Sequence, residues 1–266
     1  MLYALAETGL KVVWDICKKI EGNMRYNNIR KAKFIERLNR FIAKIEIDGE
    51  VVDCHVKNTG RCKELLLSGA DIYVEESDNP NRKTKYDLIS VYKGDLLINM
   101  DSQVPNKVVG EWLKKGHLFE NISLIKPEKV YGKSRFDFYV EEDADNKKYK
   151  EKSFREEAPA KRKAFIEVKG VTLELDGVVK FPDAPTERGV KHLKELAESI
   201  EEGYEAYVIF VIQMQGMKYF TPNEETHKEF ADTLREVVKR GVKVLAYGCK
   251  ITEDSIDIIE EVPVRL

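Results

Sequence analysis

The segment that most constrains the fold of this 266-residue chain is a short apolar run with two charges, residues 165–170 (Phe-Ile-Glu-Val-Lys-Gly). It reads as a buried strand on which Glu167 and Lys169 are the charged positions. Because side chains alternate along a strand, these two point to one face, and Ile166 and Val168 point to the other. A carboxylate and an ammonium group on one face of an apolar strand predict a site built on a sheet.

A second strand is expected at residues 135–140, where Asp137 is the single acid and its two neighbouring phenylalanines lie on the opposite face. If the two strands pair, Asp137, Glu167 and Lys169 converge. Two carboxylates supply hard oxygen ligands for Mg²⁺ or Mn²⁺, and a lysine beside them stabilises an anionic transition state or orients a nucleophilic water. The alternative is an ordinary ion pair between Glu167 and Lys169, because Asp followed later by Glu-x-Lys is a common pattern.

The three residues resemble the D…(D/E)-x-K signature of the PD-(D/E)xK nuclease-like fold. A helix signal after Lys169 and a strongly apolar strand at residues 206–212 fit an α/β domain of this kind. The first core helix of that fold often contributes another acid, which makes Glu111, on a helix expected over residues 107–115, a candidate; a solvated helix residue is the alternative. The predicted catalytic residues are Asp137, Glu167, Lys169 and Glu111, and the predicted metal ligands are Asp137 and Glu167.

Longer motifs look like those of the sugar fermentation stimulation protein (SfsA) family. They are Asn58-Thr59-Gly60-Arg61, residues 79–84 (NPNRKT), residues 134–138 (SRFDF), residues 167–173 (EVKGVTL) and residues 181–189 (FPDAPTERG). The resemblance covers residues 24–266. It implies an N-terminal OB-like β-barrel joined to a nuclease-like domain, DNA binding with little sequence specificity, and a regulatory link to sugar (maltose) metabolism.

The domain organisation expected from these features has three parts. Residues 1–23 form an N-terminal extension, which reads as an amphipathic helix or the product of an upstream start codon. Residues 24–101 form the OB-like DNA-binding barrel, since several short strands are separated by turns such as Asp48-Gly49. Residues 102–266 form the nuclease-like α/β domain with a mixed central sheet.

Basic residues are concentrated in the barrel although the whole chain has a net charge of −2. Residues 25–44 contain seven basic side chains and one acid, and the loop at residues 79–85 adds three more. This local clustering favours phosphate contacts over a role limited to solubility. On the helix after the metal site, Arg188 and His192 share one face, although a lone histidine is more often structural. The expected DNA-binding residues are Arg37, Arg40, Arg61, Arg82, Lys83, Arg188 and His192.

The remaining sequence features concern the cellular compartment and the partners of the protein. Its four cysteines show no C-x-x-C spacing, which favours a reduced, cytoplasmic protein without a zinc or redox motif. No segment approaches the ~18 apolar residues of a membrane span, so no membrane partner is expected. The charged segment at residues 141–163 reads as a long mobile hairpin tip. DNA is the expected partner, its strand form is open, and the sequence does not decide between a monomer and a homodimer.

Overall fold

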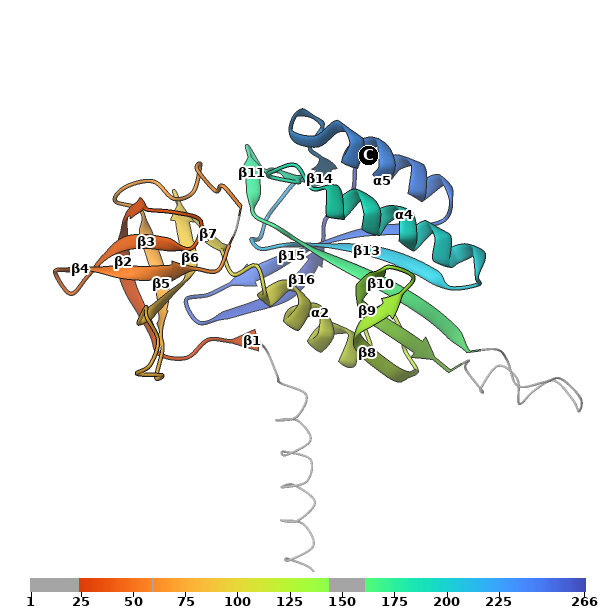
Figure 1. Ribbon diagram of the computed structural model, residues 1–266, viewed down its shortest axis with the longest axis horizontal. Coiled ribbons are helices and arrows are strands. Elements are labelled where there is room, and N and C mark those ends of the chain that lie inside the picture. The colour runs from red at the N-terminus through yellow and green to blue at the C-terminus, as the bar shows by residue number, and fades with distance from the viewer. Residues whose placement is uncertain (1–23, 59, 144–160) are drawn as a thin grey trace, which may run out of the picture.

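The structure, a computed structural model, describes residues 24–58, 60–143 and 161–266. Within these ranges the chain forms a β-barrel and an α/β domain that lie side by side (Figure 1). One apolar core runs from the barrel into the α/β domain, so the two halves pack against each other. The expectations for the N-terminal extension and for most of the charged insertion fall on residues outside the described ranges.

The first half is the OB-like barrel that the sequence predicts. Strands β2 to β6 close into a five-stranded barrel because the first residues of β6 pair in parallel with the end of β4, and β7 extends the sheet along the rest of β6. The strands are β2 (Ile29–Arg37), β3 (Ile42–Ile47), β4 (Glu50–Val56), β5 (Asp71–Glu76), β6 (Tyr86–Lys93) and β7 (Leu96–Asn99).

Turn chemistry explains two of the hairpins. Asp48 and Gly49, which join β3 to β4, have φ angles of 54° and 81°, the left-handed conformation that a two-residue hairpin turn requires. Asp176 and Gly177 repeat this arrangement between β11 and β12, with φ angles of 51° and 81°. The Asp48-Gly49 turn lies where the sequence predicts it, and both turns form because an Asp-Gly pair accepts positive φ at little cost.

The second half contains a mixed seven-stranded sheet, as the sequence predicts. Its central strands β10, β13 and β15 are parallel, and the outer strands pair antiparallel. In spatial order the strands are β1 (Met24–Arg25), β16 (Ser255–Glu261), β15 (Lys243–Ile251), β13 (Glu205–Ile212), β10 (Arg162–Val171), β9 (Ser134–Glu142) and β8 (Ile122–Tyr131). Strand β1 therefore belongs to this sheet, although the sequence assigned its residues to the barrel.

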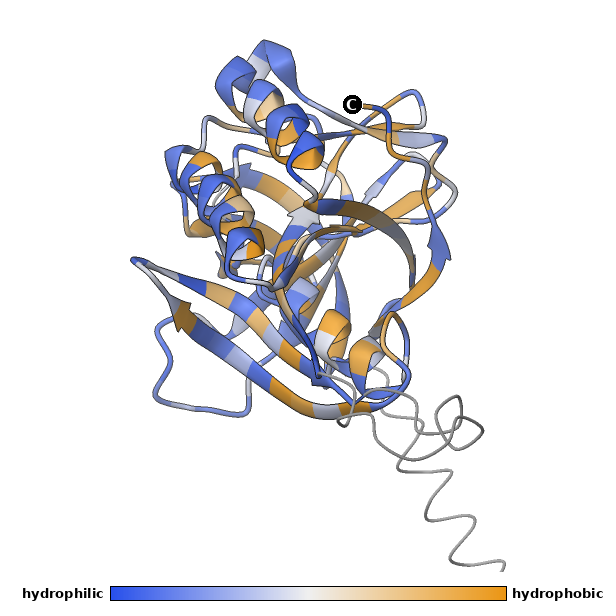
Figure 2. Cartoon of the chain, turned by 90° about the vertical axis from the view of Figure 1, so that its right-hand side faces the viewer, coloured by the Kyte–Doolittle hydropathy of each residue, from blue (hydrophilic) through white to orange (hydrophobic). Residues whose placement is uncertain are grey.

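Helices cover both faces of this sheet. Helix α2 (Val104–Lys114) packs on one face, and α4 (Glu187–Glu201) and α5 (Glu224–Lys239) pack on the other. Figure 2 shows hydrophobic residues on the sides of the helices that face the sheet. Helix α4 begins after Thr186, whose hydroxyl accepts a hydrogen bond from Gly189 N, so Thr186 is the N-cap of this helix.

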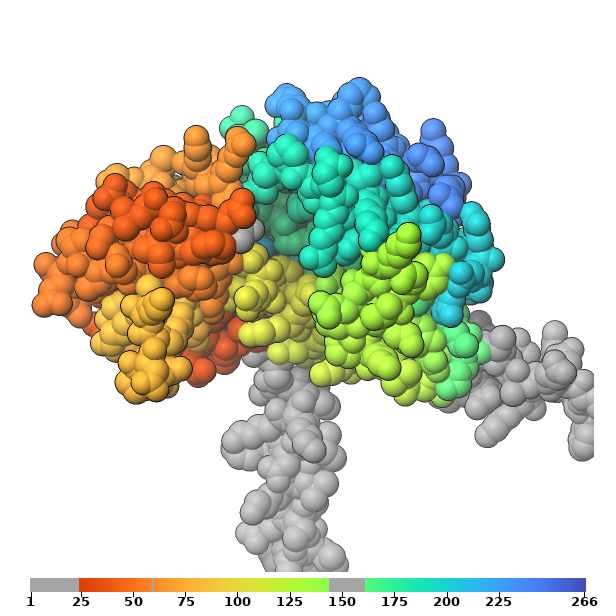
Figure 3. Space-filling model, viewed as in Figure 1, coloured from red at the N-terminus to blue at the C-terminus, as the bar shows by residue number. Residues whose placement is uncertain are grey.

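A small sheet and a hollow lie where the two halves meet. The three-stranded sheet consists of β11 (Leu173–Leu175), β12 (Val178–Phe181) and β14 (Tyr219–Pro222). Figure 3 shows a hollow between the barrel, α2 and α4, with the chain that follows β10 at its floor. A cleft of about 90 Å³ lies here, lined by Asn58 from the barrel and by Gly170 and Asp183 from the α/β domain. Gly170 directly follows Lys169, so this cleft adjoins the predicted site.

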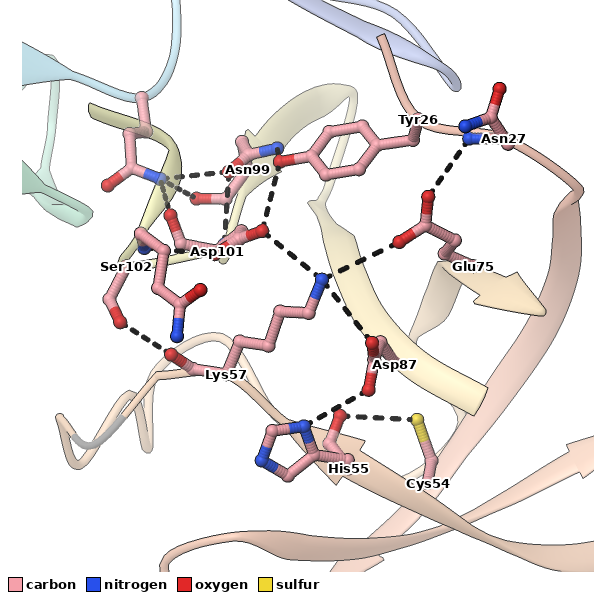
Figure 4. A network of polar contacts seen from close by, with 12 residues as sticks. Tyr26, Asn27, Cys54, His55, Lys57, Glu75, Asp87, Asn99, Asp101 and Ser102 are labelled. Carbon is pink, nitrogen blue, oxygen red and sulfur yellow. Dashed lines mark hydrogen bonds and ion pairs between the residues drawn. The ribbon is translucent and has the colours of Figure 1, made fainter. Parts of the chain in front are cut away.

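A buried polar network joins the barrel to the α/β domain (Figure 4). Lys57 Nζ lies 3.5 Å from Glu75 Oε2, 3.3 Å from Asp87 Oδ2 and 3.4 Å from Asp101 Oδ2. The main-chain carbonyl of Asp101 accepts a hydrogen bond of 3.0 Å from Gln213 Nε2, at the end of β13. The network therefore links two barrel strands, β5 and β6, and the residue after β4 to the central sheet.

Among the described residues, every helix falls short of the length and apolar character that a membrane span needs.

Candidate active site

The site begins where strands β9 and β10 separate. Their antiparallel ladder ends at the pair Phe138 and Ile166. Beyond it, Val168 N donates a 2.7 Å hydrogen bond to Asp137 Oδ2, so a carboxylate replaces the next main-chain partner. The other oxygen, Asp137 Oδ1, accepts a 2.7 Å hydrogen bond from Asn106 Nδ2 on α2. Asp137 is thus held between two strands and a helix.

The strand carrying Asp137 changes face at this residue. Phe136 packs on the α4 side, with its ring centroid 5.3 Å from that of Phe165. Phe138 packs on the α2 side, so close to Gly110 that a Cβ there would lie 3.3 Å from its ring. The expectation that both phenylalanines share one face is therefore wrong. Regular alternation is interrupted at Asp137, opposite Glu128, whose φ of 55° marks an irregularity in β8.

Glu167 and Lys169 do share a face of β10. Lys169 Nζ lies 2.5 Å from Glu167 Oε1, and His192 Nδ1 from α4 lies 2.5 Å from the same oxygen. Only 3% of Glu167 is exposed. Its second oxygen, Oε2, is buried and has no hydrogen-bond partner among the described residues. A buried carboxylate oxygen without a partner is costly, because nothing replaces the water it has lost.

The electrostatics of the two carboxyl groups are coupled. Burial and the negative charge of Glu167 together raise the pKa of Asp137 to about 6, and they outweigh the bond from Val168 N, the charge of Lys169 and the bond from Asn106, which lower it. Burial also raises the pKa of Glu167, but the hydrogen bond from His192 and the charge of Lys169 outweigh it and place that pKa below its usual range. Asp137 therefore lies in the field of an ionised Glu167, where a cation would be attracted.

His192 is a neighbour of Glu167 and does not present its ring to solvent. It is 4% exposed, and Arg188 Nε donates to its Nε2 at 3.3 Å, which places the ring proton on Nδ1, facing Glu167. The predicted pair Arg188 and His192 therefore forms a chain from the surface to the carboxylate. His192 is among the residues that line the groove described next, but its low exposure and the bond from Arg188 to Nε2 leave little of its ring for a direct DNA contact.

A basic groove of about 730 Å³ runs beside this chain, between the β8–β9 turn and the first turns of α4. Its lining includes four cationic side chains and one acid: Lys133, Arg135, Arg188, Lys191 and Glu187. Clustered cations in a concave surface attract polyanions such as a phosphate backbone.

Glu111 does not join the site. It lies on α2 beside the opposite edge of the sheet, where Met24 N donates to its carboxylate and Asp257 is a charged neighbour. Burial and the charge of Asp257 raise its pKa, and no residue of the predicted site contributes to this shift. Asn106, five residues earlier on the same helix, reaches Asp137 instead. Helical periodicity separates these two positions, since five residues turn the helix well past one full turn.

Comparison with known proteins extends over both halves of the chain. Residues 35–100 match the family model described as the SfsA N-terminal OB domain, and residues 103–255 match the model described as the sugar fermentation stimulation protein RE domain. The chain belongs to the sugar fermentation stimulation protein family. The family predicted from short motifs is thereby confirmed.

Relatives in this family match the chain at high identity. The sugar fermentation stimulation protein homolog of Clostridium beijerinckii is 59% identical over 243 residues, which cover 91% of this chain and 100% of the relative. The homolog of Ruminiclostridium cellulolyticum is 55% identical with the same coverage. A solved structure, described as Pyrococcus furiosus SfsA in complex with Ca²⁺, is 24% identical with a TM-score of 0.77, covering 91% of this chain and 98% of that one. This likeness shows that the fold is shared.

The barrel of this SfsA-family protein uses two of the predicted DNA-binding arginines internally. Arg37 directs its guanidinium to main-chain carbonyls, which makes it a structural clamp. Arg82 forms a two-pronged ion pair with Asp87, with bonds of 2.9 and 2.5 Å. Arg40, Arg61 and Lys83 are exposed, and their side chains have no partner among the described residues. The guanidinium groups of Arg37 and Arg82 are therefore occupied within the barrel, whereas the sequence analysis expected them to contact phosphates.

Sequence reasoning missed Asn106 and the network around Lys57. Asn106 lies in the first turn of α2, directly after Pro105, and a proline at that place indicates a helix start without assigning a role to the next side chain. Lys57, Asp87 and Asp101 lie far apart in the chain, and only barrel closure brings them together. An isolated charge inside an apolar strand, as at Asp87, was the one signal that could have pointed to such a network.

Proposed function

We propose that this protein binds DNA and hydrolyses its phosphodiester bonds with a divalent cation held by Asp137 and Glu167. The observation that carries the proposal is Glu167 Oε2, which is buried and has no hydrogen-bond partner among the described residues. It lies near the half-buried carboxylate of Asp137, whose pKa is raised by burial and by the charge of Glu167. Two such carboxylates repel each other unless a cation lies between them. The relative from Pyrococcus furiosus, described in complex with Ca²⁺, supports cation binding in this fold.

The donor atoms fit a hard cation. Asp137 and Glu167 offer carboxylate oxygens, the ligands that Mg²⁺, Mn²⁺ and Ca²⁺ prefer. Each Asp137 oxygen accepts one hydrogen bond and keeps a lone pair, and Glu167 Oε2 accepts none among the described residues. When bound, Mg²⁺ or Mn²⁺ would neutralise negative charge on the phosphoryl group under attack.

The protein's own side chains have separable roles in this proposal. Lys169, which faces Glu167, stabilises the negative charge that develops on the phosphate in the transition state. Asn106 and Val168 N orient the carboxylate of Asp137, and His192 orients that of Glu167. The cations of the groove neutralise flanking phosphates, which favours binding of DNA with little dependence on sequence.

The test uses labelled single-stranded and duplex DNA with Mg²⁺, Mn²⁺, Ca²⁺ or EDTA. Wild type is expected to cleave with Mg²⁺ or Mn²⁺, and Asp137→Asn or Glu167→Gln to lose cleavage while retaining affinity for DNA in EDTA. Lys169→Ala should reduce cleavage more than cation binding. Glu111→Gln is a matched control, because it neutralises an acid of the same domain that lies away from the site.

The outcomes separate cleavage from binding. If wild type cleaves no form of DNA with either cation, hydrolysis is rejected, and DNA binding stands only if affinity is retained and falls with added salt. If Glu111→Gln loses cleavage as fully as Glu167→Gln does, the assignment of the carboxylates is wrong.

A further inference from the structure

The turn between β2 and β3 and the loop after β4 are fastened together by Arg37. All five of its N–H groups donate to main-chain carbonyls: those of Asn39, Arg40, Asn58, Gly60 and Arg61, at 2.6 to 3.2 Å. Five donors in one planar group are the full capacity of a guanidinium. Two segments that are about 20 residues apart are therefore held in one fixed arrangement.

This arrangement presents an exposed aromatic side chain next to two cations. Phe41, in the β2–β3 turn, is 50% exposed. Arg40 precedes it, and Arg61 lies on the adjoining loop; both are exposed, and neither guanidinium has a partner among the described residues. We refer to Phe41, Arg40 and Arg61 as the platform. A half-exposed ring flanked by free arginines matches the composition of surfaces that stack nucleobases and contact phosphates.

The loop that Arg37 holds borders the cleft that adjoins the candidate active site. Gly60, on the clamped loop, lies so close to Asp183 that a Cβ there would be 2.1 Å from a carboxylate oxygen. Asn58, on the same loop, lines the cleft of about 90 Å³ together with Gly170, the residue after Lys169. Arg37 thus fixes the position of the platform relative to the catalytic strand.

From this placement we infer that the substrate is single-stranded DNA, guided to the active site by base stacking on Phe41 and phosphate contacts with Arg40 and Arg61. A base can stack on a protein ring only when it is not already stacked within a duplex, so an aromatic platform selects unpaired strands. The inference rests on the proposed function for cleavage of the bound strand, but binding of the strand is measured independently of cleavage.

The binding test uses fluorescence anisotropy in EDTA with a fluorescein-labelled thymidine dodecamer and with a blunt duplex of the same length. Wild type should bind the single strand more tightly, and Phe41→Ala should weaken this binding by about tenfold or more with little change for the duplex. Phe41→Trp should restore it. Arg40→Ala/Arg61→Ala should weaken binding and lower the slope of log affinity against log salt concentration by about 1.4, since each lost phosphate contact on a single strand accounts for about 0.7.

Two controls lie on the same barrel. Val51→Ala removes another exposed apolar side chain, at the start of β4, and Lys31→Ala/Lys33→Ala removes the same charge from β2. Unchanged single-strand affinity in Phe41→Ala, duplex binding as tight as single-strand binding in wild type, or equal losses in the controls would each overturn the inference. Circular dichroism melting of every variant confirms folding.

A small substrate separates failure of the platform from failure of catalysis. The p-nitrophenyl ester of thymidine 5′-phosphate needs only the Asp137 site, so Phe41→Ala should hydrolyse it like wild type with Mn²⁺ while losing affinity for the dodecamer. If wild type binds the dodecamer through Phe41 but hydrolyses neither substrate, the platform stands and the proposed hydrolysis fails. If Phe41→Ala loses ester hydrolysis together with dodecamer binding, its effect is not confined to strand binding, and the inference fails.

Discussion

His192 Nδ1 lies 2.5 Å from Glu167 Oε1, with both residues less than 5% exposed. This contact determines which oxygen of the carboxylate is left free. His192 and Lys169 both occupy Oε1, so Oε2 is the atom without a partner among the described residues. The histidine is thus a positioning residue that acts through Glu167, and Arg188 fixes its ring from the other side.

Replacement of His192 should therefore affect cation binding before it affects DNA. We expect His192→Ala to weaken Mn²⁺ binding by about tenfold or more, the usual cost of removing a group that orients a metal ligand. His192→Asn, whose amide can donate toward Glu167, should recover part of the affinity. Isothermal titration calorimetry measures the cation, and anisotropy in EDTA should show unchanged DNA affinity. Unaltered Mn²⁺ binding by His192→Ala would contradict this role.

Cation binding should also depend on pH through Asp137. Its pKa is raised from 3.8 to about 6, so protons compete with the cation below about pH 6. Affinity for Mn²⁺ should be constant above about pH 7 and fall about tenfold per unit below pH 6, as one proton is displaced. Titration calorimetry between pH 5 and 8 tests this, and a flat profile would exclude Asp137 as a ligand.

The same shift has a defined sign for stability. The folded protein holds the Asp137 proton more tightly than the unfolded chain, so this group favours folding below its ordinary pKa of 3.8 and loses that contribution as pH rises through about 6. The loss amounts to at most about 3 kcal/mol in the cation-free protein. Added Mn²⁺ should therefore raise the melting temperature more at pH 7.5 than at pH 5.

Features encoded by a few neighbouring residues were predictable from sequence. The Asp48-Gly49 and Asp176-Gly177 turns and the Thr186 cap depend on local backbone preferences, and all three are present. The acid and lysine of β10 share a face because strand alternation needs no tertiary information. The resemblance of the motifs to a known family then predicts the barrel and the mixed sheet.

Features that depend on packing between distant segments were not predictable. The strand irregularity at Asp137 reverses the expected alternation, and it lies where Glu128 on the neighbouring strand has a positive φ. In the sequence, Arg37 and Arg82 look like free cations. In the structure, main-chain carbonyls bind the guanidinium of Arg37, and the carboxylate of Asp87 pairs with that of Arg82. Charge counts along a sequence cannot distinguish an arginine that meets solvent from one that fastens loops.

Loss of the Arg37 clamp should destabilise the protein more than loss of an exposed arginine. We expect Arg37→Ala to cost about 2–3 kcal/mol, since five main-chain carbonyls lose their charge-assisted donors at once. Arg37→Lys should recover little, because one ammonium group cannot reach five carbonyls. Arg40→Ala is the matched control and should change stability by less than about 0.5 kcal/mol. Chemical denaturation compares the three variants, and equal midpoints for Arg37→Ala and Arg40→Ala would disprove the clamp.

The network at the domain junction should depend on Lys57. Its burial lowers the pKa of its ammonium group, but the charges of Asp101, Asp87 and Glu75 outweigh burial and raise it, so Lys57 stays protonated. Lys57→Met leaves these carboxylates close together with Arg82 as the remaining cation bonded to Asp87, and we expect a cost of about 3–5 kcal/mol at pH 7.5.

Acidification should narrow this difference between Lys57→Met and wild type. Without Lys57, burial and mutual repulsion raise the pKa values of the clustered carboxyls, so the variant takes up protons on folding and regains stability toward pH 5. Wild type does not gain stability in this way, because the pKa of its Asp87 carboxyl group is lowered. Burial raises this pKa, but Arg82, Lys57 and His55 lower it more. Lys44→Met, which removes a surface pair with Asp53, should cost no more than about 1 kcal/mol at either pH. Urea unfolding at pH 7.5 and pH 5 measures the free energy of unfolding of each variant. If Lys57→Met loses no more of this free energy than Lys44→Met, or loses more at pH 5 than at pH 7.5, the buried charges do not hold the domains together.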